Sequence, residues 1–446
     1  MDKRAFLRLF SSAIAGPLLR RVSAMFNTEP LTNWAGNITY STDRVRQAST
    51  VEEIRSYLKA EDKLRVLGTR HCFNSIADSQ HALLSVIPLQ EMTLDAAAHT
   101  VTVGAGVKYG QLGPYLEQNK FALHNLASLP HISVAGACST ATHGSGERNA
   151  NLASIVSALE FVTAEGDLVK LSRESDAAEF QGAVVGLGAL GVITRVTLKV
   201  QPTYQVRQYV YRNLSFRQMQ DHFDELQASG YSVSLFTDWR RKNISEVWIK
   251  SRDGDVTSFS APQELFGAKL AQQNLHPIEG LSAENCTPQM GVPGAWYERL
   301  PHFRMGFTPS AGKELQTEYL LPRRHAVEAI LAVERLHEQV SPHLLISEIR
   351  TIAADDLWLS MCYRQPSVAI HFTWKQDWPA VRNVLPVIEK ELSPFEPRPH
   401  WGKLFTMAPG DLRARYEKLG DFVNLAKKYD PKGKFRNDFL NQNLFA

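Results

Sequence analysis

The chain up to Pro202 alternates short apolar runs with segments whose apolar residues recur at helical spacing. Helical spacing over residues 52–58 and 109–118 predicts two helices. The short apolar runs predict strands at residues 65–67, 83–86 and 101–103. Helices and strands that alternate in this way predict a mixed α/β layer.

A hairpin and a glycine-rich motif follow in the same half of the chain. Residues 155–163 and 168–171 have the pattern of two strands joined by a Glu-Gly-Asp turn. Residues 186–191, Gly-Leu-Gly-Ala-Leu-Gly, match the GxGxxG pattern of nicotinamide-binding Rossmann folds. However, the β-branched run at residues 192–198 favours a strand over the required helix, and no Asp or Glu follows until Asp221. The context therefore argues against a Rossmann unit.

After Pro202 the pattern changes to longer helices that alternate with strands, which predicts a second domain. A helix is expected at residues 215–228 and a strand at residues 233–237. Residues 254–309 are rich in Pro, Gly, Ser and Asn and show little periodicity. We therefore expect a surface excursion or lid there, and no part of the core.

The last third of the chain has the clearest pattern. It predicts a strand at 318–321, a helix at 322–340 with Pro322 in its first turn, strands at 344–351 and 367–374, and a helix at 410–429. Because side chains alternate across a strand, Glu348 and Arg350 share one face of their strand. His371 and Thr373 share one face of the next. Four polar groups are thus presented in two adjacent pairs.

Length, charge and cysteine content exclude several classes of protein. Chains longer than roughly 250–300 residues usually divide into domains, so 446 residues with 44% hydrophobic content predict two. The 49 basic and 46 acidic residues leave a net charge of +3, which does not indicate a nucleic-acid-binding surface. Four cysteines without a CxxC pair indicate neither a zinc site nor a disulfide framework, and we expect no metal. No apolar run reaches the roughly 20 residues of a membrane span, and no obligate protein partner is evident.

Residues 1–24 have the order of an export leader. Lys3-Arg4-Ala5-Phe6-Leu7-Arg8 resembles a twin-arginine signal with lysine in the first arginine position, and Val22-Ser23-Ala24 resembles a cleavage site. We expect a periplasmic or exported protein. The alternative is a cytoplasmic protein whose first residues form a frayed amphipathic segment.

Two glycine-rich stretches carry the candidate cofactor chemistry. Residues 64–74 form an apolar strand that ends at Gly68 and continues into Thr69-Arg70-His71-Cys72. Glycine tolerates positive φ, and successive backbone N–H groups in such a turn form a nest for anions, so we expect a diphosphate at residues 68–71. Residues 127–146 are dense in small and hydroxyl side chains, which lets a large ligand approach the backbone. Without this second stretch, His71 would be read as a capping or core histidine.

Together these stretches resemble the FAD-binding halves of the vanillyl-alcohol oxidase and p-cresol methylhydroxylase flavoproteins, and most of all the alditol (xylitol) oxidases among them. The resemblance runs from residues 33–37, Asn-Trp-Ala-Gly-Asn, to the C-terminus. It implies an α+β fold with a two-subdomain FAD-binding α/β domain at residues 30–202. A cap domain with an antiparallel sheet flanked by helices is implied at 203–403, and residues 404–446 return to the FAD domain, which is thus discontinuous in sequence.

The resemblance implies FAD as cofactor, bonded covalently through its 8α-methyl group to His71. The chain departs from the family pattern at Arg70 and Cys72, where small residues are commoner. A linkage through Cys72 is disfavoured, because an adjacent residue points elsewhere. The implied cofactor-binding residues are Val66, Leu67, Gly68, Thr69, Arg70, His71, Cys72, Ser128, Ser133, Gly136, Thr140, Ala141, Thr142, His143, Ile193 and His400.

The polar strand residues could be exposed ion pairs, which contribute little in water. The resemblance instead places them in a polyol pocket, with Ser128, Glu348, Arg350 and Thr373 as substrate-binding residues and Lys403, Arg350 and His371 as catalytic residues. It implies oxidation of a polyol at its C1 hydroxyl to an aldose, with hydride passing to the flavin and O2 reduced to hydrogen peroxide. Lys403, with a pKa lowered by neighbouring positive charge, is expected to assist at the reacting oxygen; the final proton acceptor stays open.

Three other functions are alternatives to polyol oxidation. An aldonolactone oxidase, or a dehydrogenase that passes electrons to a carrier, has the same implied fold. A flavin-carrying sensor without turnover belongs to another class. Ser145, in His-Gly-Ser-Gly, lacks the GxSxG elbow of a hydrolase nucleophile, so a hydrolase is disfavoured.

Overall fold

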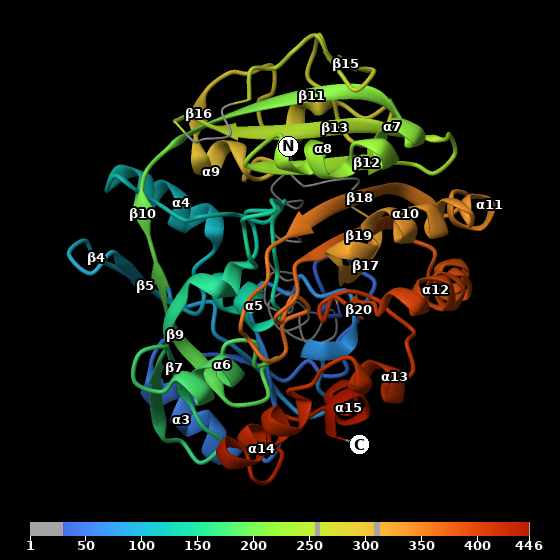
Figure 1. The fold of residues 1–446 in the computed structure, drawn as a ribbon. Coiled ribbons are helices and arrows are strands. Elements are labelled where there is room, and N and C mark those ends of the chain that lie inside the picture. Colours follow the sequence, from blue (N-terminus) through green and yellow to red (C-terminus); the bar gives the residue numbers. More distant parts are fainter. Residues whose placement is uncertain (1–29, 255–258, 307–312, 446) are drawn as a thin grey trace, which may run out of the picture.

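A computed structural model describes residues 30–254, 259–306 and 313–445. The predicted leader, residues 1–24, lies outside these ranges. The described chain forms two halves, one built on a large antiparallel sheet and one on three smaller sheets with helices (Figure 1). The α+β fold expected from the sequence is confirmed.

The first half contains a five-stranded antiparallel sheet in the order β4-β5-β9-β7-β8, a three-stranded parallel sheet in the order β1-β3-β2, and the pair β6 and β10. Its strands are β1 Val45–Gln47, β2 Arg65–Leu67, β3 Leu83–Ser85, β4 Met92–Asp95, β5 Thr100–Gly104, β6 Phe121–Ala122, β7 Val156–Val162, β8 Leu168–Ser172, β9 Val192–Lys199 and β10 Gln201–Pro202. Its helices are α3 Val51–Ala60, α4 Tyr109–Gln118, α5 Val134–Ser139 and α6 Ala177–Ala183. The predicted hairpin is β7 and β8. The GxGxxG-like residues lead into strand β9, so this half is not a Rossmann unit.

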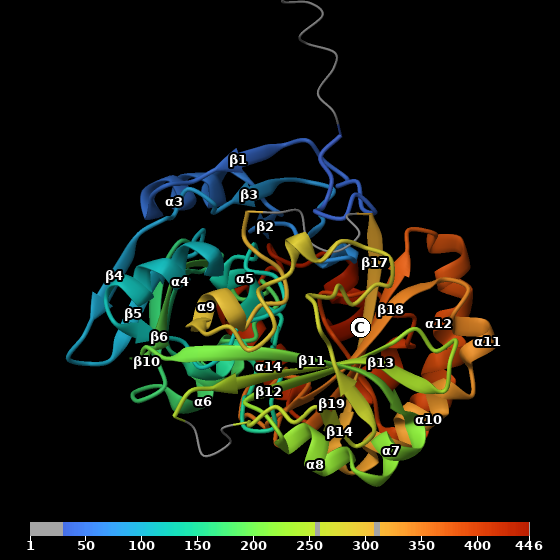
Figure 2. The same ribbon diagram turned by 90° about the horizontal axis from the view of Figure 1, so that it is seen from above.

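The second half is a ten-stranded sheet in the order β14-β15-β11-β13-β12-β18-β19-β17-β20, with β16 beside β11. Its strands are β11 Gln205–Ser215, β12 Ser232–Thr237, β13 Asn243–Arg252, β14 Glu264–Leu265, β15 Ala268–Leu270, β16 Gly294–Ala295, β17 Glu314–Pro322, β18 Leu344–Ile352, β19 Ser367–Lys375 and β20 Arg398–Pro399. Its helices are α7 Phe216–Asp221, α8 Phe223–Ala228, α9 Trp296–Arg299, α10 Ala326–Glu334, α11 His337–Val340 and α12 Trp378–Leu392. Apolar residues of α7, α8, α10 and α12 pack on one face of the sheet, away from the first half (Figures 1 and 2). The opposite face, which carries the polar residues, is thereby turned toward the first half.

The last helices return to the first half, where α14 lies beside α6 (Figure 1). These helices are α13 Pro409–Ala414, α14 Leu419–Tyr429 and α15 Asp438–Leu440. The backbone N–H of Leu64 donates to the carbonyl of Lys434 at 3.0 Å, and the Lys434 ammonium donates to the carbonyl of Leu58 at 2.8 Å. The two ends of the described chain therefore share one core.

Three predicted helices are interrupted. Pro322 is the last residue of β17 and lies in no helix, and the predicted helix beyond it is divided between α10 and α11. His222, with φ of −127° and ψ of 22°, separates α7 from α8. The predicted helix at 410–429 stops at Ala414 and resumes at Leu419, because the buried Tyr416 between them packs its ring on Trp401. Tertiary packing overrides helical spacing at this break.

Two segments of the second half contribute to the first. Trp296, inside the predicted surface excursion, is fully buried in the core of the first half. Leu357 and Leu359, in the connection between β18 and β19, are buried in the same core. Parts of the range 203–403 thus pack into the core of the first half, and residues 254–309 are not only a surface excursion.

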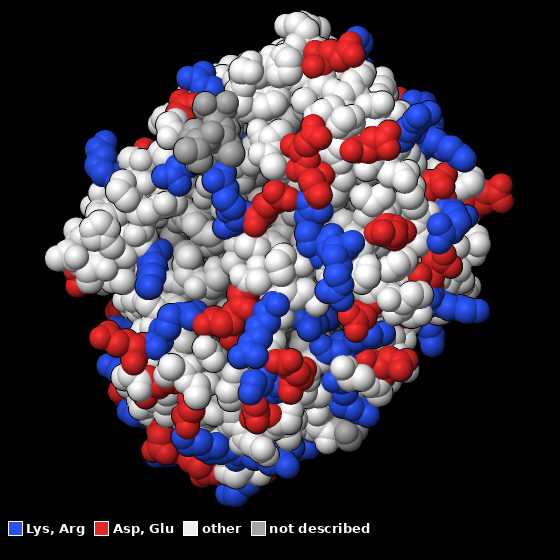
Figure 3. All heavy atoms as spheres, in the orientation of Figure 1, with Lys and Arg blue, Asp and Glu red and all other residues white. Residues whose placement is uncertain are grey.

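The outer surface shows no concentration of one charge on the face drawn in Figure 3, where acidic and basic side chains are interspersed. Among residues 30–254, 259–306 and 313–445, no helix has the length and apolar character needed to cross a membrane. All four cysteines are free thiols.

Candidate active site

A cavity between the two halves is lined by residues from both. Its walls come from β2 and the turn after it, from the stretch around α5, and from β17, β18 and β19. Of the residues proposed from the sequence, the following line it: Val66, Leu67, Gly68, Thr69, Arg70, His71, Cys72, Ser128, Ser133, Gly136, Thr140, Thr142, His143, Ile193, Glu348, Arg350, His371, Thr373, His400 and Lys403. Ala141 is the exception, because it is fully buried in the hydrophobic core behind the wall.

The His71 imidazole stands at the cavity without a polar partner. Both of its ring nitrogens are buried and have no hydrogen-bond partner among the described residues. The ring stacks on Trp34, with 5.3 Å between centroids. Burial lowers the pKa of His71 to about 4, so the ring is neutral at physiological pH. A neutral imidazole with unused nitrogens is suited to bonding with a group in the cavity.

The turn that holds His71 is fixed by side-chain amides. Asn33 donates to the carbonyl of Cys72 at 2.9 Å, and Asn37 donates to that of Phe73 at 2.8 Å. These two bonds give a structural reason why the family resemblance begins at residues 33–37, since Asn33 and Asn37 support the turn.

The expected reason for Gly68 was wrong. The residue of this turn with positive φ is Arg70, at 60°. Gly68 is required for close approach instead, since a Cβ there would lie 2.7 Å from the Ser133 hydroxyl oxygen. Gly136 meets the same hydroxyl, at 2.8 Å from its Cβ position. The turn and the start of α5 are therefore in van der Waals contact.

The two residues that depart from the family pattern have separate environments. The Arg70 guanidinium donates to the carbonyl of Thr32 at 2.7 Å. The Cys72 thiol packs near Gly402, and burial raises its pKa to about 11. Cys72 is therefore a protonated thiol, which is a poor nucleophile.

Polar side chains form a row across the sheet on the face toward the first half. Glu318 on β17 and Glu348 on β18 both pair in register with His371 on β19. The Arg350 guanidinium donates to one Glu318 oxygen, and the Lys403 ammonium donates to the other at 2.7 Å. Arg350 Nε also lies 3.6 Å from Glu348 Oε1. Two cations and two carboxylates thus form one buried cluster.

The cluster holds these groups in their charged forms. Burial raises the pKa of the Glu318 carboxyl, but the charges of Lys403 and Arg350 outweigh burial and lower it well below its usual value. In Glu348, burial is likewise outweighed by Arg350 and His302, so its pKa is lowered. The pKa of Lys403 is lowered mainly by burial, while Glu318 opposes that shift and Arg350 adds to it. The pKa of Lys403 is thus lowered, as the sequence analysis expected. The main cause is burial, and not the neighbouring positive charge that was expected.

Glu318 was missed from the sequence. Glu314, Gln316 and Glu318 recur at every second position along β17, and all three line the cavity. This spacing of two is the signal that identified Glu348 and Arg350.

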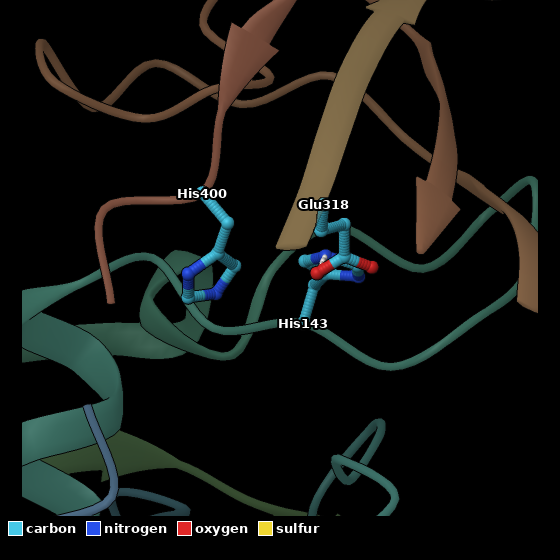
Figure 4. Close-up of side chains that lie close together, drawn as sticks. All are labelled: His143, Glu318 and His400. Carbon is cyan, nitrogen blue, oxygen red and sulfur yellow. Dashed lines mark ion pairs between the residues drawn. The ribbon is translucent and has the colours of Figure 1, made fainter. Parts of the chain in front are cut away.

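His143, Glu318 and His400 could in principle hold a cation, since their ligand atoms lie within 4.8 Å of one another (Figure 4). His143 Nε2 lies 3.4 Å from Glu318 Oε2. However, Glu318 is already bonded to Arg350 and Lys403, so a metal ion would have to approach two positive charges. The arrangement therefore favours Glu318 as an internal counter-ion to Arg350 and Lys403 over Glu318 as a metal ligand.

Comparison with known proteins identifies the family. Residues 42–172 match the family described as FAD binding domain, and residues 309–443 match the D-arabinono-1,4-lactone oxidase family. An alditol oxidase of Streptomyces sp. (strain IKD472 / FERM P-14339) is 46% identical over 419 residues, which cover 93% of this chain and 99% of that protein. This chain belongs to the alditol oxidase family. An L-gulono-1,4-lactone dehydrogenase of Mycobacterium tuberculosis (strain CDC 1551 / Oshkosh) is 27% identical, covering 92% of this chain and 98% of that protein.

Solved structures show the same fold at low identity. Cholesterol oxidase from B. sterolicum has a TM-score of 0.74 at 15% identity and covers 93% of this chain and 96% of its own. Glucooligosaccharide oxidase from Acremonium strictum has a TM-score of 0.70 at 14% identity, covering 91% and 93%. This member of the alditol oxidase family is an FAD-dependent oxidoreductase with that fold.

The cavity suits the FAD of the alditol oxidase family. The unpartnered His71 ring and the close packing around Gly68 leave backbone and imidazole facing the cavity. The glycine-rich residues Leu187, Gly188 and Gly191 also line it. The motif rejected as a nicotinamide site therefore lines the cavity, a role that the sequence analysis did not assign to it.

Arg65 holds this part of the site together. Its buried guanidinium donates to the carbonyls of Ile76, Leu187, Gly188 and Phe435, at 2.6, 2.8, 2.8 and 2.6 Å. Strand β2, the glycine-rich loop and the C-terminal segment are thus joined by one side chain.

Proposed function

We propose that this enzyme oxidises the terminal hydroxyl of a polyol such as xylitol or sorbitol to the aldose, with O2 reduced to hydrogen peroxide. The observation that carries the proposal is the row of buried hydrogen-bonding side chains in the same cavity as the His71 turn. A polyol bears a hydroxyl on every carbon, and a site with buried polar groups rejects ligands that leave those groups unpaired. The 46% identity to an alditol oxidase supports the same substrate class.

We further propose that FAD is bonded covalently to His71. The two ring nitrogens have no hydrogen-bond partner among the described residues. One glucooligosaccharide oxidase with this fold carries an 8α-N1-histidyl FAD. A covalent bond there would hold the flavin in the cavity that His71 lines.

Each side chain of the cluster has a distinct task in this reaction. FAD, when bound, accepts the hydride from the substrate's C1. Lys403 and Arg350 are placed to hold the C1 oxygen, because positive charge stabilises the negative charge that develops there. Glu318 keeps both cations in position. Glu348, Thr373, His371 and Ser128 bind the remaining hydroxyls.

The D-arabinono-1,4-lactone oxidase match over residues 309–443 favours a second candidate, an aldonolactone oxidase or a carrier-linked dehydrogenase. The cluster argues for the polyol, since an aldonolactone presents fewer hydroxyl groups to Glu348 and the other hydroxyl-binding side chains. Hydrogen peroxide formation separates an oxidase from a dehydrogenase.

Anaerobic reduction of the bound flavin tests the function directly. Xylitol and sorbitol should bleach the flavin, aldonolactones should bleach it far more slowly, and admission of air should restore the colour with formation of peroxide. If no polyol reduces the flavin, the proposed activity is wrong. This result would also support a sensor without turnover.

We also propose export through the leader at residues 1–24. The support is the order of basic, apolar and small residues in the sequence. N-terminal sequencing of the protein from its native host should find a mature start near Met25, and a start at Met1 would remove the export proposal.

A further inference from the structure

Lys250 is a buried lysine on the same sheet face as Glu348, two strands away from it. Burial lowers its pKa to about 7, while the charge of Glu348 opposes that shift, so Lys250 is an ammonium below about pH 7. It lies on β13 and is only 1% exposed. Its ammonium donates to the carbonyl of Leu300, to that of Pro301 at 3.1 Å, and to Nδ1 of His302 at 3.1 Å. An ammonium has three N–H groups, and all three are used. No role in the proposed reaction has yet been given to this residue.

When Lys250 is an ammonium, its contact fixes the tautomer of His302. Because Nδ1 accepts a hydrogen bond, the proton of the neutral ring is on Nε2. Nε2 lies 2.8 Å from Oε1 of Glu348 and donates to it. The ring is held edge-on between Phe236 and Trp248, at 5.6 and 5.2 Å between centroids. His302 therefore has one orientation and one donor directed at the cavity.

The charged groups around His302 keep it neutral. Burial lowers the pKa of His302 to about 4, the nearby charge of Lys250 lowers it further, and Glu348 opposes both. Arg350, on β18 beside Glu348, also disfavours a second proton. Behind Lys250, burial raises the pKa of the Cys286 thiol to about 12, so this thiol brings no charge.

The two oxygens of Glu348 are in different situations. Oε1 accepts from His302 and lies 3.6 Å from Arg350 Nε. Oε2 lies 3.9 Å from Nδ1 of His371, which is too far for a hydrogen bond. Oε2 is therefore the oxygen left to accept a hydrogen bond from a ligand.

We propose that Lys250 is a positioning residue that acts through His302 on Glu348. It holds His302 as the Nε2–H tautomer, His302 holds Oε1, and Oε2 is thereby presented to a substrate hydroxyl. This inference rests on the proposed polyol oxidation, and it assigns the hydroxyl-binding geometry of that site to a lysine outside the cavity.

The variant Lys250→Met tests the relay through the pH dependence of substrate binding. Without the ammonium, Nδ1 is free and His302 can take up a proton beside Glu348, which weakens the carboxylate as a hydroxyl acceptor. The KM for xylitol should then rise roughly tenfold as pH falls from about 8 to about 5, the effect of weakening one charged hydrogen bond. In the wild type, KM should stay flat below about pH 7, where Lys250 carries its charge. An unchanged KM profile in the variant would overturn the proposal.

The double variant Lys250→Met/His302→Gln distinguishes the relay from a general loss of packing. Glutamine keeps an amide N–H for Glu348 but does not titrate. The rise of KM at low pH should disappear in the double variant, and its persistence would contradict a role for His302.

Nuclear magnetic resonance of the histidine nitrogens tests the tautomer in the unmodified holoenzyme, whether or not Lys250→Met folds. The His302 signals, identified by their loss in His302→Gln, should show protonated Nε2 and unprotonated Nδ1 from about pH 6 to about pH 5, where Lys250 is an ammonium. A doubly protonated ring or the opposite tautomer would overturn the relay. If polyols fail to reduce the wild-type flavin, the proposed function fails while this measurement still decides the relay.

Discussion

At the scale of single residues, His71 has the clearest consequence. Its unpartnered nitrogens predict that the holoenzyme keeps its flavin after acid precipitation, whereas His71→Ala releases it. The absorbance of pellet and supernatant measures this. Cys72→Ser is the matched control and should keep the flavin bound, because the Cys72 thiol is protonated and buried. Flavin that washes out of the wild type in acid would rule out the covalent bond.

Lys403 is the second residue with a sharp expectation. Its ammonium is anchored by Glu318 at 2.7 Å and is directed into the cavity. Removal of one preorganised charge at a developing oxyanion typically slows a reaction by about 10²–10³-fold. Lys403→Ala should therefore reduce its flavin that much more slowly under anaerobic stopped-flow conditions, with an unchanged flavin spectrum.

Lys390→Ala, at an exposed position of α12, is the control for loss of a lysine and should behave as the wild type. If Lys403→Ala reduces its flavin at the wild-type rate, Lys403 does not contact the reacting oxygen.

At the scale of elements, the register of β18 and β19 brings Glu348 and Thr373 to one wall of the cavity. They contact hydroxyls away from C1, so their loss weakens binding and also misorients C1 for hydride transfer. Glu348→Gln and Thr373→Ala should each raise KM for xylitol and lower kcat. Lys375→Ala, at the exposed end of β19, should change neither. Steady-state kinetics with a truncated polyol and with xylitol would show whether the losses depend on the distant hydroxyls.

The contact between β2 and α5 gives a prediction about stability. A Cβ on Gly68 would lie 2.7 Å from the hydroxyl oxygen of Ser133 but 3.8 Å from its Cβ. Gly68→Ala should therefore lower the free energy of unfolding by roughly 1–3 kcal/mol, the usual cost of overpacking. Urea unfolding measures it. Gly68→Ala/Ser133→Ala should recover most of the loss, since the clashing oxygen is gone.

Gly420→Ala controls for the glycine itself. It lies in α14 with no atom within 4 Å of its Cβ position, so alanine should be neutral or stabilising by up to about 1 kcal/mol. A double variant as unstable as Gly68→Ala would show that backbone geometry, and not the hydroxyl, requires glycine.

Strand patterns predicted more of this site than helix patterns did. Alternation in β18 and β19 is local and survives folding, so Glu348, Arg350, His371 and Thr373 were placed correctly relative to their own strands. Glu318 shows the same alternation, but the sequence does not reveal that β17 pairs with β19. Only this pairing places Glu318 beside His371 in the site. His302 gave no signal, because its segment has no periodicity and its role depends on the sheet it packs against. Helix ends were misplaced where one buried ring, Tyr416, decided the path of the chain.

At the scale of the whole molecule, Arg65 connects segments from both ends of the described chain. Its guanidinium satisfies four carbonyls that are otherwise shielded from water. Leaving buried acceptors unsatisfied costs about 1–3 kcal/mol each, so Arg65→Leu should lower the free energy of unfolding by more than about 3 kcal/mol and reduce the flavin content. Arg46→Leu, an exposed arginine that lies over Tyr57, should change stability by less than about 1 kcal/mol. Equal losses in the two variants would mean that Arg65 does not join the segments.

The bond from Arg65 to the carbonyl of Phe435 spans 370 positions of the chain, and it sets an order of events during synthesis. Domains made of continuous sequence can fold while the ribosome is still extending them. Here the half that receives the flavin is begun early and lacks α13, α14 and Phe435 until the 370 positions after Arg65 have been added. Cofactor loading should therefore follow synthesis of the segment around Phe435, and a cell short of flavin should accumulate apoprotein that already contains this segment.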